Sequence, residues 1–132
     1  MIEFVHALIT VEGRYALQLR DAKTKTYPLR WSLFGGRVKK WNDGIPPSEN
    51  PYDALVREIK EELELDASGA ECFMECGPWQ FYRKAFTLHE WMGHRLHEGL
   101  AVGLFDVTEA LSVDTAPITK AVIWADIQIG EL

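Results

Sequence analysis

The residues with the most evident capacity for chemistry are four glutamates and one arginine within the nine-residue stretch 57–65, REIKEELEL. Residues three and four apart share one face of an α-helix, so Glu58, Glu61 and Glu62 would form a single acidic patch. Clustered carboxylates repel one another, and a hard divalent cation such as Mg²⁺, which prefers oxygen ligands, would offset that repulsion. Such a stretch alone is most often an ordinary solvated helix face, so its surroundings must decide between the two interpretations.

The helix that would carry this patch has clear start signals. Asn50 suits the N-cap, Pro51 suits the first helical position, and Asp53 is placed to reach back as a capping partner. An apolar stripe that can bury against a sheet is formed by Leu55, Ile59 and Leu63. The pattern therefore predicts a helix over 51–63, with the carboxylates at the margin of its buried face.

Short apolar runs on both sides of this helix predict a β-sheet. Residues 3–11 and 14–20 flank Glu12-Gly13 and predict a β-hairpin. Further strands are expected in WSLFGGRV before the helix and in AECFMECGPW, QFYRKAFTLHE and GLAVGLFDV after it. VTEAL predicts a short helix, whereas PITKAVIWADI leaves helix and strand open, with helix favoured. Together these elements predict one mixed α/β domain spanning residues 1–132.

Charge is unevenly distributed along the chain. The 132 residues carry a formal net charge of −6, which disfavours a nucleic acid polymer as partner because phosphate backbones are bound by basic faces. Residues 1–40 nevertheless hold eight Lys/Arg against three acids, and the remainder is strongly acidic. A small phosphorylated ligand is compatible with this balance.

Three further features set expectations for location and packing. The first residues, MIEFVHALITVEG, carry neither a basic segment followed by a long apolar run nor a membrane span, so a cytoplasmic protein without membrane contact is expected. Cys72 and Cys76 would lie about 13 Å apart on one strand, beyond disulfide reach, and are expected to be reduced, buried thiols. His6, within an apolar strand, is expected to be a hydrogen-bonded core residue.

The segment around the acidic stretch resembles the Nudix box, the signature of Nudix hydrolases. That signature reads Gly, five residues, Glu, seven residues, Arg-Glu, an aliphatic residue, any residue, Glu-Glu, any residue, Gly and an aliphatic residue. The matching positions are Gly36, Glu49, Arg57-Glu58, Ile59, Glu61-Glu62 and Leu65. LQLRD, WSLFGG, HEG and TEALSVDTAPITKAV extend the resemblance over nearly the whole chain. It implies the Nudix-type α/β/α sandwich around a mixed β-sheet.

Two departures from the signature stand out. Twelve residues rather than five separate Gly36 from Glu49, an insertion of seven in a loop, where added length costs little free energy. The helix and its carboxylates are expected to survive it. Glu64 stands where the signature has its second glycine, so it must adopt a left-handed conformation that is costly for a residue with a Cβ, or the helix must end differently.

The resemblance implies hydrolysis of a nucleoside diphosphate linked to another group, by attack of water on phosphorus with a divalent metal. Carried over to this chain, Glu58 and Glu62 would be metal ligands. Glu61 would be a direct or water-mediated ligand, and the carbonyl of Gly35 a backbone ligand. Mg²⁺ is the expected ion, with Mn²⁺ as the alternative.

Other residues would support the reaction. Arg57 would fix a carboxylate by a bidentate pair, and Glu49 would brace the corner between loop and helix. The general base is left open between a glutamate of the box and an acid on a distant loop, with the candidates Glu61, Glu62, Glu90 and Glu98.

Substrate binding would use the basic first third of the chain, where Arg20 and Arg37 are the candidate residues. Four aromatic residues could stack on a base, although large aromatics more often belong to the core: Trp31, Phe34, Trp79 and Phe81.

The resemblance thus implies a Mg²⁺-dependent Nudix pyrophosphohydrolase that acts on a small nucleotide, with nucleoside triphosphates as one substrate class. The alternative is a catalytically silent Nudix domain that binds a nucleotide or a protein partner, a reading suggested by Glu64 and by the insertion. The sequence fixes neither the nucleotide nor the choice between monomer and homodimer.

Overall fold

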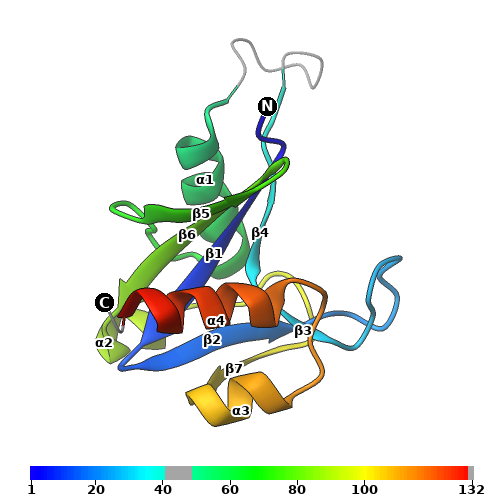
Figure 1. The fold of residues 1–132 in the computed structure, drawn as a ribbon, viewed down its shortest axis with the longest axis vertical. Coiled ribbons are helices and arrows are strands. Elements are labelled where there is room, and N and C mark those ends of the chain that lie inside the picture. The colour runs from blue at the N-terminus through cyan, green and yellow to red at the C-terminus, as the bar shows by residue number, and fades with distance from the viewer. Residues whose placement is uncertain (41–48, 131–132) are drawn as a thin grey trace.

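The computed structural model describes residues 1–40 and 49–130. In these residues one mixed β-sheet of seven strands lies between α1 on one face and α3 and α4 on the other (Figure 1). The strands are β1 (Phe4–Val11), β2 (Arg14–Leu19), β3 (Trp31–Ser32), β4 (Phe34–Arg37), β5 (Glu71–Cys76), β6 (Trp79–Phe86) and β7 (Ala101–Phe105). The helices are α1 (Pro51–Leu63), α2 (Leu88–Met92), α3 (Val107–Ser112) and α4 (Thr119–Gly130). The predicted α/β/α layering around a mixed sheet is confirmed.

The first two strands form the predicted hairpin, but they stay together only near their turn. They pair antiparallel from Ile9 opposite Ala16 to Val11 opposite Arg14. Beyond that point β1 pairs with β4 and β2 pairs with β3, while the other edge of β1 pairs in parallel with β6. Segment 31–37 therefore fills the gap where β1 and β2 separate, and this places the diglycine inside the sheet.

The pleat of β1 divides its side chains between two cores. Alternate residues face α1 and are fully or almost fully buried, namely Val5, Ala7, Ile9 and Val11. Leu8 points to the opposite face and joins the core under α3 and α4. The imidazole of His6 lies on that second face as well, because it stacks on Phe81 of β6 with ring centroids 5.9 Å apart.

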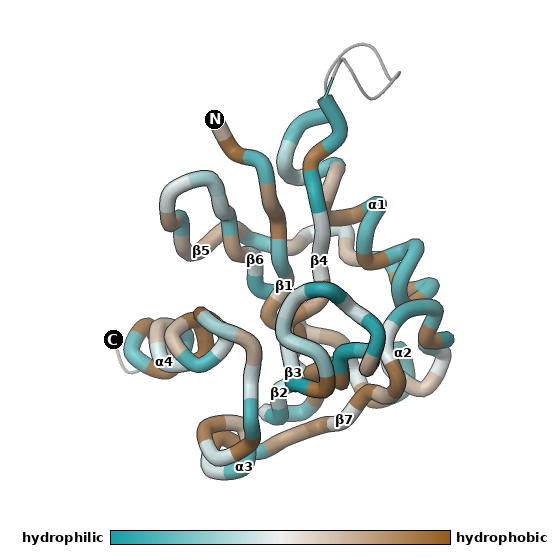
Figure 2. The backbone as a smooth tube through the Cα atoms, turned by 90° about the vertical axis from the view of Figure 1, so that its right-hand side faces the viewer, coloured by the Kyte–Doolittle hydropathy of each residue, from teal (hydrophilic) through white to brown (hydrophobic). Residues whose placement is uncertain are grey.

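The helix α1 begins and ends at the residues expected for it. The side chain of Asn50 accepts a hydrogen bond from the backbone N–H of Asp53 at 2.9 Å and donates one to the Asp53 carboxylate at 2.9 Å. The tube of α1 in Figure 2 alternates between hydrophobic and hydrophilic segments, which matches one face packed on the sheet and one facing water. At its end Glu64 adopts the left-handed conformation, with φ 56° and ψ 30°.

Residues 119–130, for which helix and strand were both open, form the helix α4. Its buried side includes Val122, Ile123 and the carboxylate of Asp126. The hydroxyl of Tyr15 donates to Asp126 at 2.8 Å, and Arg83 of β6 forms an ion pair with the same carboxylate. These contacts give a buried acid the partners it requires and fix α4 across the sheet.

The two cysteines differ from the expectation for them. Both cysteines are free and exposed, so the prediction of buried thiols was wrong. The reason is that both cysteines lie on β5, which is the last strand in the sheet order and carries an irregularity between Cys72 and Met74. The predicted insertion falls largely on residues 41–48, outside the described residues. Among the helices that the structure describes, none is long and apolar enough to span a membrane.

Candidate functional site

The diglycine is required by close approaches on both of its sides. A Cβ at Gly36 would overlap the carboxyl group of Glu58 on α1. A Cβ at Gly35 would overlap the backbone of Val5 and His6 on β1. A larger residue at Gly36 would displace the Glu58 carboxyl group, and one at Gly35 would push β4 away from β1, so the two glycines let the Glu58 carboxylate lie against β4 within the sheet.

Glu62 is the most buried carboxylate among the described residues. Only 2% of its surface is exposed. One oxygen accepts a hydrogen bond from the side-chain amide of Gln18 at 3.4 Å, whereas Oε2 has no partner among the described residues. Burial raises the pKa of Glu62 to about 9, and the charges of Glu98 and Glu58 contribute, while hydrogen bonds from the Gly35 backbone and Gln18 act in the opposite direction.

A divalent cation fits this environment. The pKa of Glu58 is raised too, mainly by burial, and the nearby charges of Glu61 and Glu98 add to the effect. The charges of Glu58 and Glu98 thus act on Glu62, whose buried oxygen has no partner among the described residues, and a hard cation with oxygen ligands stabilises such a charge pattern. Within residues 1–40 and 49–130, however, no three His, Cys, Asp or Glu side chains are already arranged as a metal-binding group.

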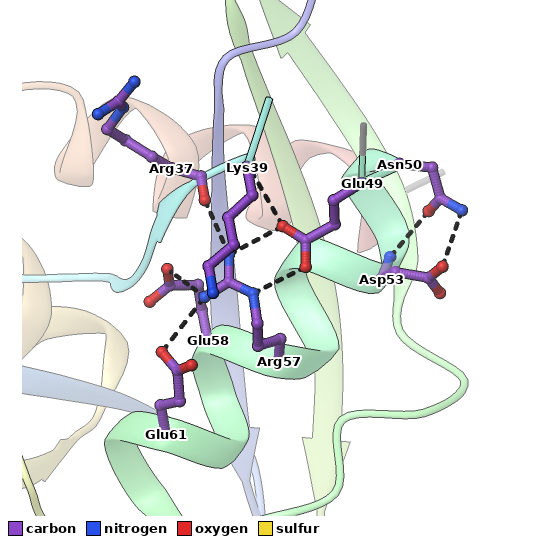
Figure 3. Close-up of polar contacts among 8 residues, drawn as sticks. All are labelled: Arg37, Lys39, Glu49, Asn50, Asp53, Arg57, Glu58 and Glu61. Carbon is purple, nitrogen blue, oxygen red and sulfur yellow. Dashed lines mark hydrogen bonds and ion pairs between the residues drawn. The ribbon is translucent and has the colours of Figure 1, made fainter. Parts of the chain in front are cut away.

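Arg57 binds the carboxylates of Glu58 and Glu61 and so keeps them from a shared metal position. Its guanidinium binds both oxygens of Glu49, at 2.7 and 2.9 Å, and the carbonyl of Arg37 at 3.0 Å. The same side chain donates to Glu58 at 3.0 Å and to Glu61 at 3.2 Å (Figure 3). Arg57 therefore holds two of the predicted ligands by their carboxylates and ties the start of α1 to the end of β4.

Glu49 completes this corner. Its Oε1 also accepts a hydrogen bond from the backbone N–H of Lys39 at 3.0 Å. The hydrogen bonds from Arg57 are the main reason that the pKa of Glu49 is lowered. A carboxylate held by a fork of two N–H groups and a main-chain donor stays charged and immobile, which suits the bracing role that the resemblance implies.

The two remaining candidates for the general base, Glu90 and Glu98, lie in different places. Glu98 lines a small polar cavity of about 120 Å³ together with Gly35 and Glu62. Glu90 instead closes a capping box with Thr87 at the start of α2 and lines neither of the two cavities described here. The structure therefore brings Glu98, and not Glu90, to the acidic residues of α1.

The loop that carries Glu98 is attached to the end of α1. The backbone N–H groups of Arg95 and His97 donate to the carbonyls of Leu63 and Glu62, both at 2.9 Å. The side chain of His97 contacts the carboxylate of Glu64. The left-handed residue that replaces the signature's glycine thus participates in holding the loop next to the site.

A larger cavity of about 450 Å³ adjoins the small one, and both are lined by His6, Arg20 and Leu33. Its other walls include Phe4, Ser32, Trp79, Phe81 and Thr119. It opens on the α4 face of the sheet, whereas the acidic cavity lies toward α1. The splaying of β1 and β2 places the two cavities next to each other.

The two arginines predicted to bind substrate lie in different places. Arg20 lies between the two cavities, where its guanidinium donates to the carbonyl of Thr26 at 2.9 Å and to the hydroxyls of Thr24 and Thr26 at 3.0 Å. Arg37 is exposed, and its side chain extends away from Arg57 (Figure 3).

Of the four aromatic candidates, Trp79 and Phe81 line the larger cavity. Phe34 is fully buried in the core, and Trp31 packs edge-on against Phe105. Sequence reasoning missed Gln18, Ser32 and Thr119 as lining residues, because nothing in their spacing marks them.

Comparison with known proteins identifies the family of this chain. The NUDIX domain model matches residues 3–124, so the chain belongs to the Nudix hydrolase family. It is 31% identical over 123 residues to the CTP pyrophosphohydrolase of Escherichia coli K12, covering 89% of this chain and 84% of that protein. It is 36% identical over 75 residues to the nucleoside triphosphatase NudI of Klebsiella pneumoniae, covering 56% and 45%.

The fold is shared more widely. The crystal structure of the MutT protein from Methanosarcina mazei Go1 superimposes with a TM-score of 0.62 at 21% identity, covering 97% of this chain and 93% of that one. A structure of DR0079 from Deinococcus radiodurans gives a TM-score of 0.72 at 13% identity, with coverages of 92% and 80%. These likenesses concern the fold.

Proposed function

We propose that this protein is a divalent-metal-dependent pyrophosphohydrolase of nucleoside triphosphates, with Mg²⁺ as the ion. The observation that carries the proposal is the buried carboxylate of Glu62, which has one oxygen without a partner among the described residues and a pKa of about 9. A buried charge is stable only when it is paired or bound to a metal. A cation at this carboxylate would keep it ionised at neutral pH.

In this proposal Glu58 and Glu62 would hold the ion, with the Gly35 carbonyl as a backbone ligand. Glu61 would become a direct or water-mediated ligand if its side chain turned away from Arg57. When bound, the ion would supply neutralisation of phosphate oxygens and a more acidic water. Arg57 and Glu49 contribute by fixing the start of α1 against β4, so the carboxylates keep their positions relative to the diglycine.

Glu98 is the proposed general base. Its position beside Glu62 in the small cavity allows it to accept a proton from the water that attacks phosphorus. The anhydride P–O bond then breaks, and its electron pair leaves with the departing phosphate group. Glu61 remains the competing candidate from within α1.

The likeness to a CTP pyrophosphohydrolase makes CTP the first substrate to test. The phosphates would lie at the small acidic cavity and the nucleoside in the larger one, whose volume of about 450 Å³ is of the size typical for small-molecule sites. Arg20, at the junction, would face the phosphates.

The deciding experiment is incubation of the protein with the common ribonucleoside and deoxyribonucleoside triphosphates and with Mg²⁺ or Mn²⁺, with products followed by ³¹P NMR. A nucleoside monophosphate and pyrophosphate are expected, with no reaction in EDTA. Absence of any metal-dependent product across the panel would overturn the proposal. Nucleotide binding that is unchanged by EDTA, without turnover, would instead support the silent binding domain.

A further inference from the structure

Two side chains on the wall of the larger cavity each carry a buried polar atom that has no hydrogen-bond partner among the described residues. Ser32 is 6% exposed, and neither its Oγ nor the Nδ1 of His6 has a partner among the described residues. Buried polar atoms in proteins are nearly always hydrogen-bonded. Both side chains line the same cavity, where a bound ligand could supply a partner. The expectation that His6 is a hydrogen-bonded core residue was therefore wrong.

His6 is held rigidly at the junction of the two cavities. Its backbone pairs with Gly35 on one side and with Phe81 on the other. The imidazole stacks on the Phe81 ring at an interplanar angle of 27°. Because Gly35 has no side chain, its Cα lies directly against the imidazole. A ring packed in this way can present its nitrogens to a ligand with little loss of side-chain entropy on binding.

The imidazole of His6 lines the larger cavity. An uncharged imidazole offers one hydrogen-bond donor and one acceptor. The hydroxyl of Ser32 can also donate or accept, so this part of the wall can match either kind of polar atom.

The rest of the larger cavity contains no acid among its described lining residues, and its walls are mainly aromatic and aliphatic. Its one cationic side chain, Arg20, is already bonded to Thr24 and Thr26. Neutral polar atoms set in an apolar wall complement an uncharged aromatic heterocycle, which stacks on rings and pairs through its edge.

We infer that His6 and Ser32 are the specificity-determining residues of this protein, and that they select the base of the nucleotide by hydrogen bonds to its edge. The inference rests on the proposed function in that the ligand is taken to be a nucleotide. Sites that hydrogen-bond a ligand discriminate strongly, because a mismatched ligand leaves buried polar atoms without partners.

The test compares the affinities of CMP, UMP, AMP and GMP by calorimetry without metal, for the wild type and three variants. His6→Phe keeps a flat ring but removes both polar nitrogens. His6→Asn restores a neutral donor and acceptor close to the position of Nδ1. Ser32→Ala removes only the hydroxyl, and His89→Phe is the matched control because His89 is exposed on α2 and lines neither cavity. Melting curves confirm that each variant is folded.

The wild type should prefer one base, and His6→Phe should weaken binding of that nucleotide by about 10-fold or more while changing the others less. Ser32→Ala should act in the same direction, His6→Asn should restore most of the preference, and His89→Phe should match the wild type. With the triphosphates and Mg²⁺, His6→Phe should raise KM more than it lowers kcat.

Equal binding of all four nucleotides by the wild type would overturn the inference. So would an unchanged order of preference in both His6→Phe and Ser32→Ala. The calorimetric arm needs no turnover, so selective binding that depends on His6, in a protein without metal-dependent hydrolysis, would count against the proposed function and leave the inference standing.

Discussion

The two adjoining cavities of this protein differ in the chemical character of their lining residues. The small one is lined by Glu62 and Glu98, and burial together with the charges of Glu98 and Glu58 raises the pKa of Glu62 there. The larger one is lined mainly by aromatic and aliphatic side chains on the α4 face, with His6 as a neutral polar group. The first suits a cation and phosphate oxygens, and the second suits an uncharged ring.

This difference indicates that reaction and selection depend on different physical effects. Electrostatic repulsion between the buried carboxylate of Glu62 and its acidic neighbours would be released by one bound cation. Recognition in the apolar cavity depends on shape and on a few hydrogen bonds. Changes on the acidic side should therefore affect turnover, whereas changes on the apolar side should affect which nucleotide binds.

Glu62→Gln should have the largest effect. The amide keeps the shape of the side chain but cannot act as an anionic ligand, so kcat should fall by at least about 100-fold with Mg²⁺. The preference among nucleoside monophosphates should stay as in the wild type. Pyrophosphate release and calorimetry measure the two quantities, with the exposed Glu71→Gln as control. Near-normal turnover would contradict the ligand assignment.

Gly36→Ala tests the contact between β4 and α1. The added Cβ would overlap the Glu58 carboxyl group, so this carboxyl group must move from its position and turnover should fall by about 10-fold to 100-fold. The melting temperature should fall as well. Gly130→Ala, where a Cβ meets no neighbour within 4 Å, is the matched control. Equal behaviour of the two variants would show that the close approach is unimportant.

Arg57→Lys should be milder. Lysine cannot reproduce the fork that binds Glu49 at 2.7 and 2.9 Å, so kcat should fall by about 10-fold and the free energy of unfolding by about 1–3 kcal/mol. Chemical denaturation measures the latter. In the control, Arg30→Lys, an exposed pair with Asp114 at 3.5 Å is altered, and the expected loss is under about 0.5 kcal/mol.

The pH dependence of stability should separate the two cavities. Glu62 has a folded-state pKa of about 9, above its ordinary value of 4.5, so the folded state binds the proton more tightly than the unfolded state. Stability of the metal-free protein should therefore decrease as pH rises from about 4.5 to about 9.

Melting curves from pH 6 to pH 9, without metal, measure this effect. Glu62→Gln should show a smaller decrease than the wild type, and millimolar Mg²⁺ should reduce the decrease in the wild type by mass action. A wild type and a Glu62→Gln variant with parallel profiles would show that Glu62 does not titrate in this range.

Glu64→Gly should have the smallest effect. Glycine adopts the left-handed conformation of this residue, φ 56°, without strain, but the variant loses the contact with His97. A rise in melting temperature of about 1–3 °C is expected, with a small loss of turnover if the Glu98 loop loosens. A lower melting temperature would show that the contact outweighs the strain.

Much of the fold was predictable because its signals are local. The capping residue Asn50, the stripe of apolar residues in α1 and the turn at Glu12-Gly13 each act within a few positions of the chain. The exposure of Cys72 was not predictable, since it depends on β5 being the last strand in the sheet order.

Within the candidate site, the sequence by itself determined the acidic side. Glu58, Glu61 and Glu62 share a helical face by their spacing, and Gly36, Glu49 and Arg57 belong to the same signature. Helical periodicity places such residues together whatever the rest of the chain does.

Only the tertiary structure decided what lies opposite them. Glu98, and not Glu90, lies beside Glu62 in the small cavity. Arg57 contacts three acids. His6, Ser32 and Thr119, which are far apart in sequence, line one cavity. Those residues meet because β1 and β2 separate and the sheet folds around the gap. Contacts of that kind depend on packing between distant segments, for which spacing along the chain carries no signal.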